Sequence, residues 1–280
     1  MDDDALREAL LDWYEEAHRD LPWRETTEPY QILVSEVMLQ QTQVSRVVPQ
    51  YEAFLERFPT LEALARAPLA DVIEQWDGLG FNNRAKRLKR AAETVVDEHD
   101  GAVPRDVDAL QELPGVGPYT ANAVASFAFD DGGPVFDANV RRVLHRFHGP
   151  AEDDELRMVH ERLFPEGDSR RWNNAIMELG ALVCTGGTPE CRRCPWREDC
   201  TAWARQEFSS PETRSQGDFE GSWRSYRSSL LKALMEEPLD VDDVADAIDL
   251  PERYDADELV DELDDEGMVV LRGDTVALPE

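Results

Sequence analysis

The chain has 280 residues, 41% of them hydrophobic, and its 60 acidic against 29 basic side chains give a formal net charge of −31. The length suggests two domains and the apolar content argues against wholesale disorder, while the lack of any apolar run near about 18 residues excludes a transmembrane helix. The first residues have neither the basic nor the apolar segment of a signal peptide, so we expect a cytoplasmic protein with no membrane partner.

The sequence up to about residue 208 predicts helices. In the first, Leu6, Leu10 and Trp13 recur at the helical period, and Pro29 suits the first position of the next, which carries an apolar face. Further helical patterns cover residues 61–67, 69–76, 84–98, 106–113, 118–129, 139–148, 154–163 and 170–184. No alternating pattern of useful length precedes residue 265, so we predict a mainly α-helical fold.

A segment rich in Ser, Pro and Gly, residues 209–222, predicts a linker before a small C-terminal domain at 223–280. In that domain, helical stretches at 224–236, 241–249 and 255–266 precede two short strands and a turn, which is the order of a winged helix. Residues 234–280 hold 18 acidic and two basic side chains. Because this balance is poor for DNA, we expect a protein partner or a stabilising role for the domain.

The acidic excess comes with an unusual choice of bases, three lysines against 26 arginines. Acid-rich, lysine-poor chains suit molar salt, as in halophiles, where a Debye length of about 3 Å removes long-range repulsion. The alternative is an acidic protein that does not bind DNA. Local charge therefore matters more than the total, and residues 81–148 are near balance, with nine bases and ten acids.

All four cysteines lie within 17 residues, in the spacing C-x6-C-x2-C-x5-C: Cys184, Cys191, Cys194 and Cys200. A disulfide framework would spread them more widely, so we predict one site with four thiolate ligands, either for zinc or for an iron–sulfur cluster. Arg192, Arg193 and Arg197 lie between these ligands. They could present guanidinium groups to phosphates or merely balance the charge of the thiolates.

The string Leu-Pro-Gly-Val-Gly-Pro at residues 113–118 separates two helical patterns. Gly115 and Gly117 permit a tight hairpin with exposed backbone N–H groups, and Pro118 opens the next helix with its positive N-terminus facing the same way. Such a hairpin binds a phosphate without any side-chain charge, which suits an acidic chain. A plain helix–helix turn is the simpler interpretation, but the complete string favours a DNA-binding helix-hairpin-helix.

Two carboxylates have contrasting surroundings. Asp137 precedes a helix that carries three arginines, so the helix dipole and these arginines should keep it ionised, although it could simply cap the helix. Glu36 projects from an apolar-flanked face, where desolvation would favour its protonated form; a solvated surface glutamate is the alternative. One neutral acid and one ionised carboxylate form the pair that cleaves a glycosidic bond.

In order along the chain, these motifs resemble those of the MutY adenine DNA glycosylases, within the helix-hairpin-helix glycosylases that include endonuclease III. The resemblance covers about residues 6–205. It rests on Leu-Pro-Trp-Arg at 21–24, Ser-Glu-Val-Met-Leu-Gln-Gln-Thr at 35–42, Gly-Leu-Gly-Phe at 78–81, residues 113–120, Asp-Ala-Asn-Val at 137–140 and the four cysteines. The stretch around Glu36 is the most specific of these, because relatives of endonuclease III lack that glutamate in its Leu-Gln-Gln-Thr context.

The resemblance implies a two-lobed helix-hairpin-helix glycosylase fold that acts as a monomer. A six-helix domain with the hairpin would span 28–131, and an iron–sulfur domain would combine 1–27 with 132–208. The linker and the acidic winged-helix-like domain would follow. The resemblance also selects a 4Fe–4S cluster as the group held by the cysteines.

The implied reaction is the removal of adenine that is mispaired with guanine or 8-oxoguanine in double-stranded DNA, after the base is flipped into a pocket. Glu36 would protonate adenine N7, Asp137 would stabilise the oxocarbenium-like sugar, and Asn139 would hold the water or the sugar. Gln41 and Phe81 would fill space in the base stack. The residues matched at the substrate or the DNA are Trp23, Arg24, Leu39, Gln41, Phe81, Gly115, Gly117, Asn174, Arg192 and Arg193.

Tyr119 stands where lyase-competent relatives carry a lysine, and because a phenol forms no Schiff base, a monofunctional glycosylase is implied. The chain also departs from the family pattern. Asn82 follows Phe81 where a second aromatic is usual, and Asn174 replaces a Glu or Gln beside the adenine. About 60 residues follow the linker, too few for the MutT-like domain that reads 8-oxoguanine in the family.

Two other functions remain open at the level of the sequence. A thymine or uracil mismatch glycosylase would share Asp137, Tyr119 and the cluster, but a pyrimidine has no N7 for Glu36 to protonate. A non-catalytic iron–sulfur protein that binds DNA or senses redox state would keep the cysteines and the hairpin. Such a protein has no reason to carry Glu36 and Asp137 together.

Overall fold

The computed structural model describes residues 1–211 and 217–279, and the described chain is mainly helical, which confirms the predicted fold class. It divides into two compact units, described here one at a time. Unit 1 holds the described residues of 1–33, 105–111 and 116–214, and unit 2 holds those of 34–104, 112–115 and 215–280. Residues 212–216 of the predicted linker lie outside the described residues.

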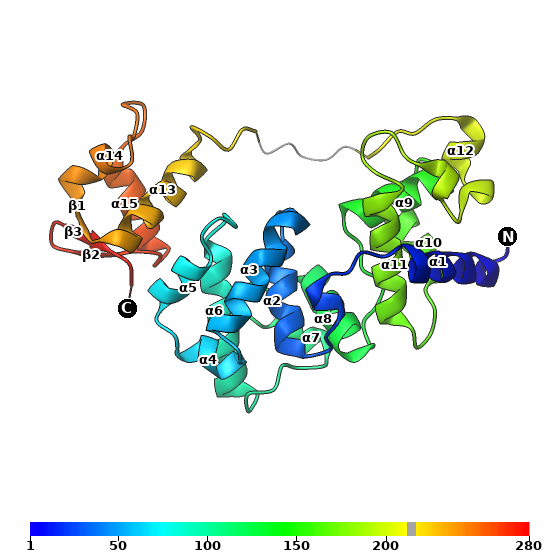
Figure 1. Ribbon diagram of the computed structural model, residues 1–280, viewed down its shortest axis with the longest axis horizontal. Coiled ribbons are helices and arrows are strands. Elements are labelled where there is room, and N and C mark those ends of the chain that lie inside the picture. The colour runs from blue at the N-terminus through cyan, green and yellow to red at the C-terminus, as the bar shows by residue number, and fades with distance from the viewer. Residues whose placement is uncertain (212–216, 280) are drawn as a thin grey trace. The chain divides into compact units, whose positions relative to one another are not determined.

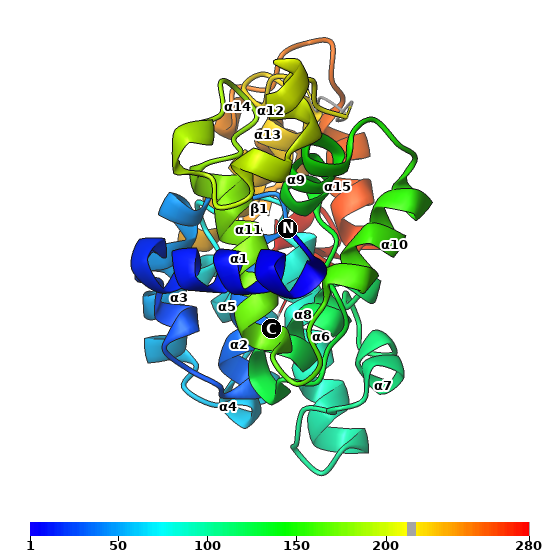
Figure 2. The ribbon, with the colours of Figure 1, turned by 90° about the vertical axis from the view of Figure 1, so that its right-hand side faces the viewer.

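Unit 1 is helical throughout, and α2 (Pro29–Leu39) starts in it and ends in unit 2. Its other elements are α1 (Asp3–Ala17), η1 (Pro22–Arg24), α7 (Val107–Gln111), α8 (Pro118–Phe129), α9 (Ala138–His148), α10 (Asp153–Leu163), α11 (Ser169–Leu182), η2 (Cys191–Arg193), η3 (Arg197–Asp199) and α12 (Thr201–Arg205). In Figures 1 and 2, α1 runs across α11, which also contacts α8 and α9. Among the described residues, none of the helices has the length and apolar character needed to cross a bilayer.

The core of unit 1 surrounds α11. Trp172, Ile176 and Leu179 are fully buried at the i, i+4, i+7 spacing that gives a helix one apolar stripe. Trp196, between the last two cysteines, joins this core, and its indole N–H donates to the carbonyl of Leu6 on α1 at 2.8 Å. The cysteine loop is therefore anchored to the first helix of the chain by a buried hydrogen bond.

The first part of unit 2 is a set of packed helices: α3 (Val44–Arg57), α4 (Leu61–Arg66), α5 (Leu69–Gln75) and α6 (Asn83–Glu98). Helix α6 packs against both α4 and α5 through Leu88, Ala92 and Val95, which are all buried. Arg84, in the first turn of α6, is buried, with only 6% of the residue exposed. Arginine is rarely buried unless its charge has partners, so Arg84 must be paired within the fold.

The C-terminal part of unit 2 has the predicted helices and hairpin, together with one additional strand. Its elements are α13 (Trp223–Glu236), β1 (Leu239–Asp240), η4 (Val241–Asp243), α14 (Val244–Ala247), α15 (Ala256–Asp265), β2 (Val270–Arg272) and β3 (Thr275–Ala277). The three strands are antiparallel in the order β1-β3-β2, and buried Val276 pairs with Leu239 on one side and Leu271 on the other. A two-residue strand such as β1 is too short to produce an alternating pattern in the sequence.

Candidate functional site

Asp137 caps α9, and both of its carboxylate oxygens are engaged. The backbone N–H of Val140 donates to Oδ1 at 2.7 Å, and Nδ2 of Asn139 donates to Oδ2 at 2.9 Å. The capping role and the candidate catalytic role are therefore compatible, because the cap fixes the orientation of the carboxylate. The side chain remains partly exposed, so a sugar could reach it.

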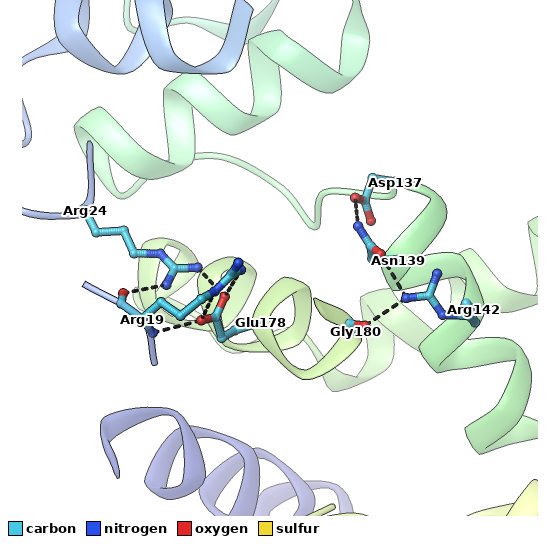
Figure 3. A network of polar contacts seen from close by, with 7 residues as sticks. All are labelled: Arg19, Arg24, Asp137, Asn139, Arg142, Glu178 and Gly180. Carbon is cyan, nitrogen blue, oxygen red and sulfur yellow. Dashed lines mark hydrogen bonds and ion pairs between the residues drawn. The ribbon is translucent and has the colours of Figure 1, made fainter. Parts of the chain in front are cut away.

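Asn139 is itself held by Arg142, one turn further along α9 (Figure 3). Arg142 Nη2 donates to Asn139 Oδ1 at 2.9 Å and to the carbonyl of Gly180 at 2.8 Å. Its Nε donates to the carbonyl of Cys184 at 2.7 Å. Since the amide oxygen of Asn139 accepts from an arginine, its NH2 group must face Asp137.

The other two arginines of α9 have partners of their own. Arg141 pairs with Asp153 at 2.5 Å, and Arg146 Nη1 donates to the carbonyl of Thr185 at 2.7 Å. Arg146 lies nine positions after the cap, on the opposite side of the helix, so its side chain is directed away from Asp137. Arg146 Nη1 also lies 3.5 Å from Cys184 Sγ, so this arginine is placed to balance thiolate charge.

A second network lies on α11 of unit 1 (Figure 3). Glu178 is fully buried and accepts hydrogen bonds from Arg19 Nη2 at 2.7 Å and Arg24 Nη2 at 2.8 Å. Burial alone would raise the pKa of Glu178, but the two arginines outweigh it and lower that pKa to about 2. Arg24 thus holds the segment after α1 against α11, and neighbouring Trp23 is buried.

Helices α8 and α11 carry Tyr119 and Asn174. The Tyr119 hydroxyl lies 3.9 Å from Met177 Sδ, and the side chain is half-buried. Asn174 donates from Nδ2 to the carbonyl of Arg170 at 2.9 Å, one turn back on its own helix. An asparagine is too short to reach as far as the Glu or Gln that it replaces, and here its amide is used within α11.

Glu36 lies on α2 and is 4% exposed, which excludes the alternative of a solvated surface glutamate. The flanking residues Ser35 and Val37 are buried as well, and Leu39 at the end of the helix is half-buried. Glu36 belongs to unit 2 and Asp137 to unit 1. The apolar surroundings expected for Glu36 from its neighbours on the helix are therefore present.

Gln41 and Phe81 share a rare backbone conformation. Their φ angles are +57° and +49°, in the left-handed region that costs a residue with a Cβ about 1 kcal/mol or more, and both side chains are exposed. Phe81 is 40% exposed, which is high for a large apolar side chain. Backbone strain of this kind often occurs at functional sites, and here it coincides with exposed side chains.

Arg84 donates hydrogen bonds to the backbone of both turns. Its guanidinium donates to five carbonyls and one hydroxyl, those of Val37 (3.0 Å), Met38 (2.9 Å), Gln40 (2.5 Å), Leu79 (3.1 Å), Gly80 (2.9 Å) and Thr42 Oγ1 (2.9 Å). The carbonyls of Gln40 and Gly80 belong to the peptides immediately before Gln41 and Phe81. Burial lowers the pKa of Arg84 to about 10, which leaves it charged at neutral pH.

The predicted hairpin joins α7 to α8. Gly115 has a φ of +82°, and a Cβ there would lie 2.8 Å from the Cβ of Arg87, so glycine is required on two counts. Gly117 has an extended backbone, and α8 begins at Pro118 as predicted. The hairpin thus presents backbone N–H groups at the start of a twelve-residue helix.

All four cysteines line one small cavity, together with Arg146 and Arg197. Burial, and then the neighbouring thiols, raise the pKa of Cys194 to about 12 in the absence of metal. No three His, Cys, Asp or Glu side chains of the described residues are close enough to share one metal ion. Four thiols around one cavity are a donor set that fits either zinc or an iron–sulfur cluster.

The arginines between the cysteines are directed to acidic neighbours or to solvent. Arg193 pairs with Glu190 at 2.9 Å, Arg197 Nε donates to Glu198 at 2.8 Å, and Arg192 is exposed. Arg192 and Arg193 could bind phosphates or balance the charge of the thiolates. Both are exposed on η2, which is compatible with phosphate binding. The arginine that lies beside a cysteine thiol is Arg146 of α9, next to Cys184.

The residues of these networks that were not recognised from the sequence as site residues include Arg19, Arg84, Glu178 and Gly180. A glutamate within the apolar stripe of α11 is a signal that could have been used, because buried charges need partners. Arg84 and Gly180 gave no such signal, since their partners are backbone groups brought together only by folding.

The geometry of a hairpin before α8, a capped aspartate and a ring of cysteines agrees with comparisons to known proteins. Residues 34–165 match the family model described as HhH-GPD superfamily base excision DNA repair protein. The adenine DNA glycosylase of Mycolicibacterium smegmatis is 46% identical over 232 residues, covering 80% of this chain and 78% of that protein. The human adenine DNA glycosylase is 42% identical over 234 residues, covering 78% of this chain and 42% of that protein.

Solved structures share the fold. A thermostable thymine-DNA glycosylase superposes with a TM-score of 0.68 at 30% identity, covering 72% of this chain and 97% of that one. A trapped endonuclease III–DNA covalent intermediate gives 0.63 at 25% identity, covering 74% and 99%. The chain therefore belongs to the HhH-GPD superfamily of base excision DNA repair proteins and, within it, to the adenine DNA glycosylase family. The expected family and fold are confirmed.

Proposed function

We propose that this protein is a monofunctional DNA glycosylase that removes adenine mispaired with guanine or 8-oxoguanine. The observation that carries the proposal is the Asp137 carboxylate, held by Val140 N–H and Asn139 at the start of α9. The relatives named as adenine DNA glycosylases support the choice of base. Double-stranded DNA is the partner expected of the superfamily.

In the proposed mechanism, buried Glu36 donates a proton to N7 of the flipped adenine and weakens the glycosidic bond. Positive charge then develops on the sugar, and the ionised carboxylate of Asp137 stabilises it. Asn139, turned by Arg142, keeps that carboxylate in place and can orient the attacking water. Water completes the hydrolysis, and an abasic site remains.

The surrounding residues take supporting roles in this proposal. Gln41 and Phe81, held in strained turns above Arg84, fill the space left by the flipped base. Gly115 and Gly117 bind a phosphate through the hairpin. Trp23, Arg24, Leu39 and Asn174 surround the adenine pocket, and exposed Arg192 and Arg193 approach the DNA backbone.

Cys184, Cys191, Cys194 and Cys200 are the residues that would hold a 4Fe–4S cluster. When bound, its irons would keep the thiolates deprotonated and would join the two ends of the 184–200 segment. Loop anchoring by Trp196 and charge balance by Arg146 support this assignment.

A thymine or uracil mismatch glycosylase is the second candidate, favoured by the superposition on the thymine-DNA glycosylase. Base release from duplexes containing A:G, A:8-oxoG, T:G and U:G pairs separates the two functions. We expect release of adenine alone, and Glu36→Gln should abolish it while leaving DNA binding intact. Preferential release of thymine or uracil would replace the proposal by the second candidate, and binding without release of any base would favour a sensor.

The remaining proposals concern context. The acidic composition favours a cytoplasmic monomer that works in concentrated salt, so activity should persist in molar KCl. The acidic side chains of α15, such as Asp257 and Glu258, favour a protein partner for that helix. Loss of activity in molar KCl would remove the explanation offered for the acidic surface.

A further inference from the structure

Unit 2 contains a groove of about 710 Å³ with an unusual charge. Its lining includes five arginines, at positions 46, 84, 87, 224 and 227, and one acidic residue, Asp77. The whole chain has about two acidic side chains for every basic one. The groove therefore reverses the charge of the chain locally, and the exposed turn residues Gln41 and Phe81 also line it.

Arg84 and Arg227 are engaged with several other groups of the protein. Arg84 donates to the carbonyls of the two turns, and Arg227 pairs with Glu262 at 2.7 Å and with Glu266 at 2.5 Å. Arg46 and Arg87 differ, because both are exposed and, within the part of the chain that the structure describes, neither guanidinium has a hydrogen bond or ion pair. Their charge is available to a ligand.

Each of these two arginines follows one of the strained turns in the sequence and lines the groove. Arg46 is in the first turn of α3, just after Gln41, and Arg87 is in the second turn of α6, just after Phe81. The side chain of Arg87 also runs along Gly115 of the hairpin. Within unit 2, Arg87 therefore lies beside Gly115 and also lines the groove that both turn residues line.

Helix α13 contributes Arg224 to the lining of the groove. The guanidinium of Arg224 lies 5.9 Å from the centre of the Phe81 ring, within the range of a cation–π contact. The helix carries Arg224, Arg227 and Lys232 before its first acidic residue, Glu236. The expectation that the tail is poor for DNA therefore holds for residues 234–280 but not for the start of α13.

We propose that this groove binds the phosphodiester backbone of DNA beside Gln41 and Phe81, and that Arg224 makes the C-terminal region part of the DNA interface. The inference rests on the proposed function, because these turn residues meet DNA in a glycosylase complex. A guanidinium group can donate two parallel hydrogen bonds to one phosphate, so direct contact with the arginines supplies the attraction between the groove and DNA. In molar salt, where charges act over only about 3 Å, such contacts outweigh the distant acidic excess.

The test measures the affinity of the full-length protein, with its metal centre loaded, for a labelled homoduplex across a KCl series. A homoduplex offers no mispaired adenine to cleave. Arg46→Gln, Arg87→Gln and Arg224→Gln should each weaken binding and reduce the slope of log Kd against log [KCl] by about 0.9, the value for one phosphate contact. The matched controls, Arg90→Gln on α6 and Lys232→Gln on α13, remove one charge outside the groove and should leave the slope unchanged.

Arg224→Lys should restore most of the slope lost in Arg224→Gln, which separates lost charge from damaged packing. An unchanged slope in Arg224→Gln would overturn the role of α13, and equal losses in groove and control variants would show that only total charge matters. Adenine release from an A:G duplex is measured in parallel. If no adenine is released although the groove variants change the slope, the glycosylase assignment fails and the DNA-binding groove stands.

Discussion

Gly180 of α11 lies directly against Asn139 of α9, and a Cβ at position 180 would fall 2.8 Å from the Cβ of Asn139. The absent side chain allows the two helices to approach. That approach in turn lets the carbonyl of Gly180 accept a hydrogen bond from Arg142, the residue that turns Asn139 toward Asp137 (Figure 3). Helix packing therefore sets the position of the proposed catalytic carboxylate.

Gly180→Ala should slow adenine release without weakening DNA binding. The added methyl group displaces the first turn of α9 by a few tenths of an ångström, because its Cβ would lie 3.2 Å from the carbonyl oxygen of Asn139. Displacements of this kind can cost catalysis 10-fold or more. Single-turnover rates and Kd values for an A:G duplex measure the two effects separately. Gly187→Ala, where a Cβ meets nothing within 4 Å, is the control, and an unchanged rate in Gly180→Ala would contradict the argument.

Arg84→Lys should destabilise the fold and disturb the two turns. An ammonium has three donors and cannot replace the fork that serves six acceptors, so buried carbonyls are left without partners at about 1–3 kcal/mol each. Urea unfolding should show a loss of at least about 2 kcal/mol, against no measurable loss for Arg87→Lys on the exposed side of the same helix. Adding Gln41→Gly to Arg84→Lys should recover part of the loss, because glycine adopts a positive φ without strain. A wild-type midpoint in Arg84→Lys would show that the hydrogen bonds are dispensable.

Tyr119→Lys should introduce strand cleavage. The half-buried phenol of Tyr119 cannot form an imine, whereas a lysine amine at this position could condense with the abasic sugar and promote elimination. Denaturing gels run without alkali would show nicked DNA for the variant and intact strands for the wild type. Borohydride should trap the imine as a covalent complex. Tyr119→Met removes the hydroxyl without adding an amine and should not nick; nicking by both variants would mean that position 119 does not supply the nucleophile.

Glu178 should make stability depend on acidity in a defined window. Its pKa is about 2 in the folded protein against an ordinary 4.5, so the folded state binds this proton less readily than the unfolded chain. The stabilisation is complete above about pH 5 and is lost as the pH falls from 4.5 toward 2; a shift of this size corresponds to about 3 kcal/mol. Glu178→Gln should therefore be less stable than wild type at pH 7, and the difference should shrink by pH 3.

Urea unfolding at pH 7, 5 and 3 measures that difference. Glu161→Gln, which changes an exposed glutamate on α10, should leave stability unchanged at all three values. A stability difference between wild type and Glu178→Gln that does not change with pH would show that the two arginines do not hold the carboxylate ionised.

Much of the molecule follows from local sequence. The start of α8 at Pro118 and the cap of α9 at Asp137 were predictable, because proline and aspartate at helix starts act within one turn. The burial of Glu36 was predictable from its apolar neighbours on α2. The cysteine ring was predictable from spacing alone, since its ligands come from one short segment.

Contacts between distant segments were not predictable. The sequence places Arg142 on the helix that Asp137 caps, but it does not reveal that Arg142 donates to the carbonyls of Gly180 and Cys184, which lie about 40 residues further along the chain. Arg84 binds carbonyls from two turns, and Arg224 joins Phe81 across 143 positions. The sequence by itself determined the helices, their caps and the inventory of chemical groups, because these depend on interactions within a few residues. The tertiary structure alone decided which backbone carbonyl each buried arginine binds, since every residue carries the same carbonyl and only folding brings a particular one within reach.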